Sequence, residues 1–105
     1  MSKYMLISVC ERDIATEQFD SFEDARNQMM NEVEREVWDI LSELPEVEDV
    51  MDEDGDYDDE DVWNEIKNLD RYEYSDDYGF AFGEKWAWSN VDDDYKYDWL
   101  IVEIH

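Results

Sequence analysis

The sequence predicts an α+β fold, in which a small antiparallel sheet carries one long amphipathic helix on one face, plus a short second helix. Three observations support this prediction. Residues 4–10 form a short apolar run, residues 22–44 place apolar side chains at helical spacing, and residues 80–104 contain aromatic and β-branched runs separated by turns. A length of 105 residues corresponds to one domain, 1–105, with an acidic loop at about 45–61.

The first strand is predicted at residues 4–10, and residues 11–18, which carry both charges without a clear period, are predicted to form a loop. The long helix follows, with Asp20 or Ser21 as its N-cap. Pro45 ends it, because the residue before a proline is pushed out of helical geometry. Its apolar stripe comprises Phe22, Ala25, Met29, Val33, Val37, Ile40, Leu41 and Leu44.

The segment after the helix is dominated by acidic residues, and no basic residue occurs between Arg35 and Lys67. Gly55 marks a turn within it. We expect Asp61 to cap the short second helix. The apolar side of that helix comprises Val62, Trp63, Ile66 and Leu69.

The last third predicts antiparallel strands. Residues 80–82 and 86–88 flank Gly83-Glu84, which suits a two-residue type II′ turn with glycine first. This register sets Ala81 opposite Trp86 and Phe80 opposite Ala87, with the phenylalanines on one face and the tryptophans on the other. A turn at residues 90–94 leads to a final strand at 97–104.

Large apolar residues occupy both faces of this predicted sheet, and one helix covers only one face well. Two arrangements remain open. Either Trp86, Trp88 or Trp99 is partly exposed and marks an interface, or the short helix and the acidic loop cover the second face.

The composition combines 33 acidic and eight basic residues, a net charge of −25, with 15% aromatic and 43% hydrophobic residues. Such a chain folds, but it is repelled by nucleic acids and by anionic membranes. The single cysteine, Cys10, allows no internal disulfide, and no stretch is long enough for a membrane span. The N-terminal residues do not form a signal peptide, so we expect a cytoplasmic protein.

Catalysis and metal binding have little support in the sequence. Aligning Gly55 to position 6 of an EF-hand loop puts Val50 at position 1 and Asp61 at position 12, so the first ligand and the bidentate glutamate are missing. His105 is the last residue, and the acids beside Cys10 disfavour a reactive thiolate. We therefore expect that the protein is not an enzyme and that it has no specific metal site and no cofactor.

The acidic residues themselves are the remaining feature. Carboxylates one helical turn apart are separated by about 5–6 Å, which is comparable to the spacing of phosphates along a nucleic-acid strand. Interleaved tyrosines and tryptophans supply binding energy that charges alone do not. The predicted partner-binding residues are Glu32, Glu36, Asp39 and Glu43 on the helix and Asp52, Asp54, Asp56, Asp58 and Asp59 in the loop.

In size, charge and placement of acids over about residues 32–61 and 70–98, the chain resembles the phage-encoded DNA mimics. These small acidic proteins inhibit restriction enzymes, uracil-DNA glycosylase or CRISPR nucleases. The resemblance implies a one-to-one or homodimeric inhibitor of a basic nucleic-acid-binding protein, in a bacterial or phage-infected cytoplasm. Because such inhibitors share no single fold, it transfers no contact residues.

Two other functions fit the same composition. A small adaptor or regulatory protein would use its acidic face to bind a basic segment of a partner that does not bind nucleic acid. A halophile domain would carry acids to remain soluble in high salt, although the abundance of large apolar residues is unusual for that class.

Overall fold

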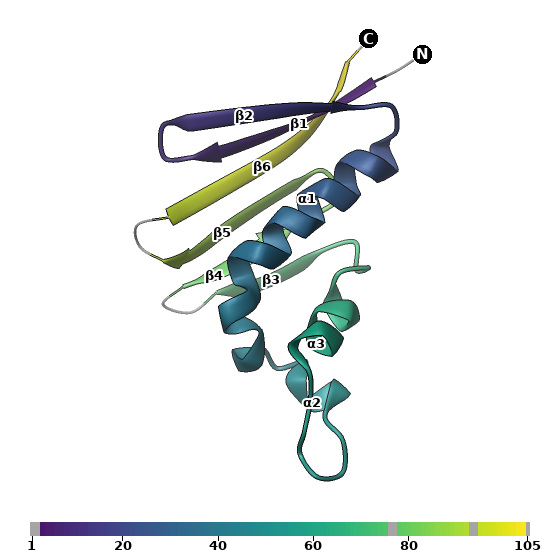
Figure 1. Cartoon of the computed structure of the whole chain (residues 1–105), viewed down its shortest axis with the longest axis vertical. Coiled ribbons are helices and arrows are strands. Elements are labelled where there is room, and N and C mark those ends of the chain that lie inside the picture. Colours follow the sequence, from purple (N-terminus) through teal and green to yellow (C-terminus); the bar gives the residue numbers. More distant parts are fainter. Residues whose placement is uncertain (1–2, 76–77, 93–94, 105) are drawn as a thin grey trace.

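Six antiparallel strands form one sheet in the order β2-β1-β6-β5-β4-β3, which confirms the α+β class (Figure 1). The computed structural model describes residues 3–75, 78–92 and 95–104. The predicted turn at 90–94 therefore lies partly outside the described residues, and His105 lies wholly outside them. The strands are β1 Lys3–Cys10, β2 Asp13–Phe19, β3 Tyr72–Ser75, β4 Gly79–Phe82, β5 Trp86–Asp92 and β6 Tyr95–Ile104.

The prediction of a loop at residues 11–18 is wrong, because β2 pairs with β1 along its whole length. Glu11, at a φ of 55°, closes the tight turn between the two strands. As an edge strand, β2 exposes every side chain except that of Phe19, which is half-buried. Because neither side of β2 is buried, its sequence does not have to alternate between apolar and polar residues. Backbone hydrogen bonding to β1 is what makes it a strand.

The long helix is confirmed and begins where its cap predicts. Ser21 Oγ accepts a hydrogen bond from the backbone N–H of Asp24 at 3.1 Å, and α1 covers Phe22–Val37. The chain then continues as a 3₁₀ segment, η1, at Trp38–Glu43, and stops before Pro45. Ile40 and Leu41 of η1 are buried, so the tighter turns keep the apolar stripe on the core.

Two further helices follow, α2 at Val47–Val50 and α3 at Asp59–Ile66. The predicted second helix corresponds to α3, but it begins before Asp61, with Asp58 as its N-cap residue. Val62, Trp63 and Ile66 are buried as predicted, whereas Leu69 lies beyond the helix and is 44% exposed. Among the described residues, no helix has the length and apolar character needed to cross a membrane.

The hairpin between β4 and β5 differs from its predicted register by two residues. Phe82 pairs with Ala87 and Ala81 with Trp88, so Glu84-Lys85 forms the turn and Gly83 precedes it. Glycine is needed there because a Cβ atom would lie 2.4 Å from the indole nitrogen of Trp86. Gly83, which predicted a turn position, is therefore explained by the close packing of the Trp86 ring over the backbone.

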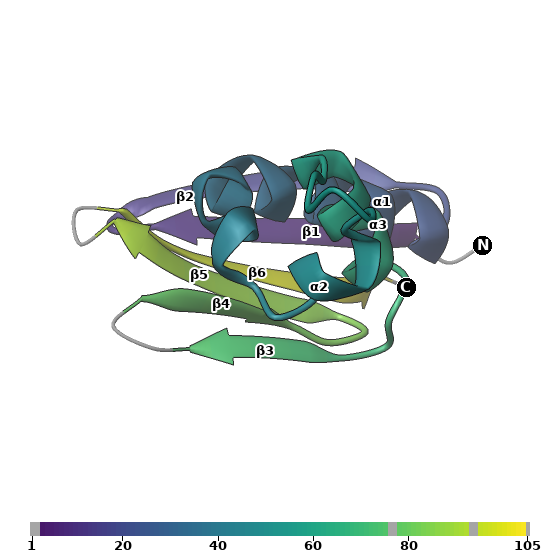
Figure 2. The same cartoon turned by 90° about the horizontal axis from the view of Figure 1, so that it is seen from below.

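All three helices lie on one side of the sheet, which we call the covered face (Figure 2). α1 contacts β1, β2, β5 and β6, and Trp63 of α3 packs against the rings of Phe80 and Phe82. Arg26 of α1 adds hydrogen bonds to the carbonyls of Gly83 and Leu69, at 3.2 and 3.1 Å. Trp99 is also buried on the covered face, so it is not an exposed aromatic.

No helix among the described residues covers the opposite side, which we call the open face. The two predicted alternatives are thereby resolved, since α3 and the acidic loop accompany α1 instead of covering the second face. Trp86 is 38% exposed on the open face and Trp88 is half-buried there. The larger apolar side chains of the open face are Met5, Ile7, Val9, Ile14, Trp86, Trp88, Leu100, Val102 and Ile104, and the buried Ala81 also lies on this side.

The role of η1 in the core predicts a difference between two leucines. Leu41→Ala removes a side chain that is 0% exposed and should lower the free energy of unfolding by about 2–5 kcal/mol. Leu69→Ala, at a 44% exposed position, should change it by no more than about 0.5 kcal/mol. Urea denaturation followed by circular dichroism measures both, and equal effects would contradict a core that includes η1.

Candidate functional site: the acidic end of the helical layer

The strongest concentration of charge is the segment from the end of η1 to the first turn of α3, residues 43–61, which we call the acidic end. It contains 12 acidic residues and no basic one. Its loop forms the lower tip of the molecule in Figure 1, at one end of the longest axis of 51 Å. The short helices and Pro45 fold this polar segment back on itself, so that its acids gather at one place.

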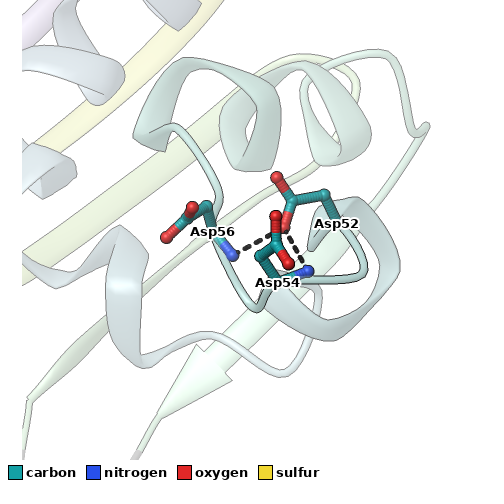
Figure 3. Close-up of side chains that lie close together, drawn as sticks. All are labelled: Asp52, Asp54 and Asp56. Carbon is teal, nitrogen blue, oxygen red and sulfur yellow. Dashed lines mark hydrogen bonds between the residues drawn. The ribbon is translucent and has the colours of Figure 1, made fainter.

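The tip of the acidic end is ordered by one of its own carboxylates. Asp52 Oδ1 accepts hydrogen bonds from the backbone N–H groups of Asp54 and Asp56, at 2.9 and 2.8 Å (Figure 3). The N–H of Asp52 donates in turn to the carbonyl of Asp56. Gly55 takes a φ of 85°, which confirms the predicted turn. The tip is therefore a defined turn that holds the Asp52 carboxylate and the backbone of Asp54 and Asp56 in place.

The side chains of Asp52, Asp54 and Asp56 come close together, with carboxylate oxygens within 4.8 Å of one another. Carboxylates are hard oxygen ligands of the kind that Ca²⁺ and Mg²⁺ prefer. All three are exposed, however, and one carboxylate oxygen of Asp52 already accepts the two hydrogen bonds of the turn. We assign no metal site to this cluster, and its significance here is the local density of negative charge.

Tyrosines of the sheet region fix two more carboxylates. The hydroxyl of Tyr72 donates a hydrogen bond of 2.8 Å to Glu46, and the hydroxyl of Tyr78 donates one to Glu43. Tyr72 also stacks on Phe82, at 5.9 Å between ring centroids. Burial raises the pKa of the Tyr72 hydroxyl, and the hydrogen bond to Glu46 raises it further. The hydroxyl therefore remains protonated and can donate this bond. The core of the sheet thus positions the acidic end.

The acids of α1 do not form the single exposed row that helical spacing predicts. Glu32 and Glu36 are half-buried at the flank of the helix, and the most exposed positions of its middle are Asn27, Asn31 and Arg35. At Trp38 the helix changes to a 3₁₀ segment, which has fewer residues per turn. Acids spaced for an α-helix therefore no longer lie on one face beyond this point.

Glu32 instead lines a hollow of about 350 Å³ above β1 and β2, together with Glu17. It accepts a 3.2 Å hydrogen bond from Gln28. Partial burial raises the pKa of the neighbouring Glu36, with a smaller upward contribution from Glu32 and an opposing one from Arg35. By helical rise, Glu36 lies roughly 14 Å and Glu32 roughly 20 Å from Glu43 along the helical segment.

Six of the nine predicted partner-binding residues therefore lie in the acidic end, and three lie outside it. The acidic end contains Glu43, Asp52, Asp54, Asp56, Asp58 and Asp59; Asp39 is exposed on η1, and Glu32 and Glu36 lie apart. The prediction omitted the other six acids of this segment, although the long stretch without a basic residue already included them: Glu46, Glu48, Asp49, Glu53, Glu60 and Asp61. The sequence indicated that interleaved tyrosines contribute to binding, but not that Tyr72 and Tyr78 hydrogen-bond to Glu46 and Glu43, since they reach the site from the sheet region.

The open face has a different charge. Among the strand side chains that the structure describes, it carries only the acids Glu73 and Asp98, with the bases Lys3 and Lys96. Residues 22–66, which form the helical layer, contain 19 acidic and two basic residues, a net charge of −17. The negative charge is thus strongly asymmetric across the sheet.

Comparisons with protein families, with curated proteins and with solved structures give no match for this chain. The functional argument therefore depends on the site itself. Its defining features are an ordered, highly acidic end and a nearly neutral apolar face on the other side of the sheet.

The raised pKa of Glu36 gives a pH prediction. Because the folded state binds this proton more readily than the unfolded state, stability should fall as pH rises from about 4.5 through the raised value. Glu36→Gln removes this penalty, so it should raise the melting temperature at pH 7, and the gain should vanish near pH 4.

Glu84→Gln is the control, since it removes one acid from an exposed turn. The comparison separates local burial from general charge repulsion. Thermal denaturation of both variants between pH 4 and pH 8 measures the effect. A gain for Glu36→Gln that equals the gain for Glu84→Gln at every pH would contradict the assignment.

Proposed function

We propose that this protein is an acidic nucleic-acid mimic, which binds the basic cleft of a DNA- or RNA-binding protein and inhibits it. A CRISPR nuclease, a restriction enzyme and a DNA-repair enzyme are the partner classes that fit. In this proposal the acidic end enters the cleft, while the protein itself binds neither nucleic acid nor membrane and performs no catalysis. The expected location is the cytoplasm of a bacterial or phage-infected cell.

The observation that carries the proposal is the order and density of charge at the acidic end. Twelve acids lie within 19 residues, without a basic neighbour in the sequence. The turn at Asp52 and the hydrogen bonds from Tyr72 and Tyr78 hold several of them in fixed positions. A merely solvated surface requires no such positioning.

Fixed charges are valuable to a mimic for two reasons. A basic cleft binds a row of closely spaced phosphates, and replacing them releases the same counterions from the cleft. Carboxylates that are already positioned lose less side-chain entropy on binding than mobile ones do. The cluster of Asp52, Asp54 and Asp56 provides such a closely spaced group at the tip.

The acidic end also offers apolar contact surface beside its charges. A shallow hollow of about 210 Å³ is lined by Val50 and Tyr57 and by four aspartates, Asp52, Asp56, Asp58 and Asp61. Tyr57 is half-buried and packs against the core. A lysine or arginine of a partner fits this chemistry, because its stem packs on Tyr57 and its charge meets the carboxylates.

The test neutralises four exposed acids whose side chains make no described hydrogen bond, Glu48→Gln, Asp49→Asn, Glu53→Gln and Asp54→Asn. Asp52 and the first turn of α3 are left intact, because the former orders the tip and the latter stabilises the helix dipole. The immobilised protein is exposed to a bacterial lysate, and retained proteins are identified by mass spectrometry. We expect retention of nucleic-acid-binding proteins at low salt and loss of at least about tenfold in the variant.

The matched control removes four exposed acids elsewhere, Glu11→Gln, Glu17→Gln, Asp20→Asn and Glu84→Gln, with the same change in net charge. It should retain the same proteins within about twofold, because charges outside the contact surface contribute little. Equal losses in the two variants would reject the acidic end as the contact surface. Retention of partners that do not bind nucleic acid would favour an adaptor instead.

A further inference from the structure

We infer that the open face binds the open face of a second copy of this chain, which gives a back-to-back dimer. None of its nine larger apolar side chains belongs to the core cluster or packs against it. Ile14 is 69% exposed, Leu100 47% and Trp86 38%. Contiguous apolar surface of this kind marks an interface in soluble proteins.

The register of the strands shows that these side chains form neighbouring rows across the sheet. Leu100 pairs with Ile7 on one side and with Trp86 on the other. The next row runs from Ile14 through Val9 to Asp98 of β6 and then to Trp88, so one charged side chain lies within it. Paired residues of an antiparallel sheet point to the same side, so the apolar surface extends from β2 to β5.

The size of the open face suits a dimer. Six strands spaced about 4.8 Å apart span about 24 Å; four of them have seven to ten residues and extend for roughly 23–33 Å, and β3 and β4 have four residues and extend for roughly 13 Å. The projected area is therefore of the order of 600 Å², before the relief of the side chains is counted. A stable protein interface buries about 800 Å² on each partner, so this face is close to the required size.

The charges on the open face are self-complementary. Lys3 and Lys96 balance Glu73 and Asp98 among the described strand side chains. In a two-fold symmetric dimer, a residue of one copy meets a different residue of the other, so a face with both signs can pair with itself. A basic partner is attracted to the acidic end instead, because the open face has no excess of negative charge.

The repulsion between two chains of charge −25 does not prevent this dimer at physiological salt. Packed sheets are about 10 Å apart, and each helical layer adds roughly another 10 Å, so the two acidic layers are separated by about 30 Å. The Debye length is about 8 Å at 0.15 M salt and about 30 Å at 0.01 M. The dimer should therefore become stronger as salt is raised.

The direction of the salt dependence distinguishes the dimer from the proposed function. Binding of a basic partner weakens as salt is raised, whereas the back-to-back dimer strengthens. If the partner proposal fails, the dimer is unaffected, since the two use opposite faces of the sheet. If both hold, one dimer presents two acidic ends.

The test is sedimentation equilibrium of the full chain, whose monomer mass is 12.8 kDa, at about 0.01, 0.15 and 0.5 M NaCl. We expect a concentration-dependent dimer of twice that mass, with a dissociation constant that falls as salt rises. Leu100→Lys should raise the dissociation constant by at least about tenfold. Leu69→Lys is the matched control, because Leu69 is similarly exposed but lies outside the open face, and it should leave dimerisation unchanged.

Ile14→Lys provides a second variant on an edge strand, and it decides the outcome if circular dichroism shows that Leu100→Lys is unfolded. A wild-type protein that remains monomeric at every salt concentration would overturn the inference. So would a dimer that survives both substitutions in folded variants, since association would then use another surface, such as the free edge of β2 or β3.

Discussion

The contact between α1 and one face of the antiparallel sheet is the interaction on which the rest of the structure depends. Met29, Val33 and Val37 are completely buried in it, and η1 continues the same stripe with Leu41. A chain of 105 residues has too little helix to cover both faces of six strands, so its helices gather on one side. This one-sided packing creates the two surfaces that matter for function, an acidic helical layer and an apolar open face.

The same packing allows the fold to carry its charge. Self-repulsion opposes compaction, and its effect is smallest where carboxylates are solvated and separated from the core. The acidic end extends beyond the sheet at the lower tip of the molecule (Figure 1), and it contains 12 of the 33 acidic residues. Tyr72 connects the two regions, because its ring packs on Phe80 and Phe82 while its hydroxyl binds Glu46.

Much of the fold could be predicted from the sequence, because its long helix and inner strands bury apolar side chains with a regular period. The edge strand β2 could not, since exposure on both sides removes that period. The register of the β4–β5 hairpin was mispredicted because Gly83 accommodates Trp86 instead of forming the turn. For the candidate site, composition located the acidic end, but it could not show that Glu32 and Glu36 are half-buried. The contacts of Tyr72 and Tyr78 depend on tertiary structure alone.

The central claim is that the acidic end takes the place of nucleic acid in a basic cleft. The most direct measurement is equilibrium competition, in which duplex DNA or RNA is titrated against a complex of this protein with a retained nucleic-acid-binding partner. The account predicts mutually exclusive binding, so that the apparent dissociation constant rises in proportion to the concentration of competing nucleic acid. A stable ternary complex, with an affinity unchanged at saturating nucleic acid, would contradict it.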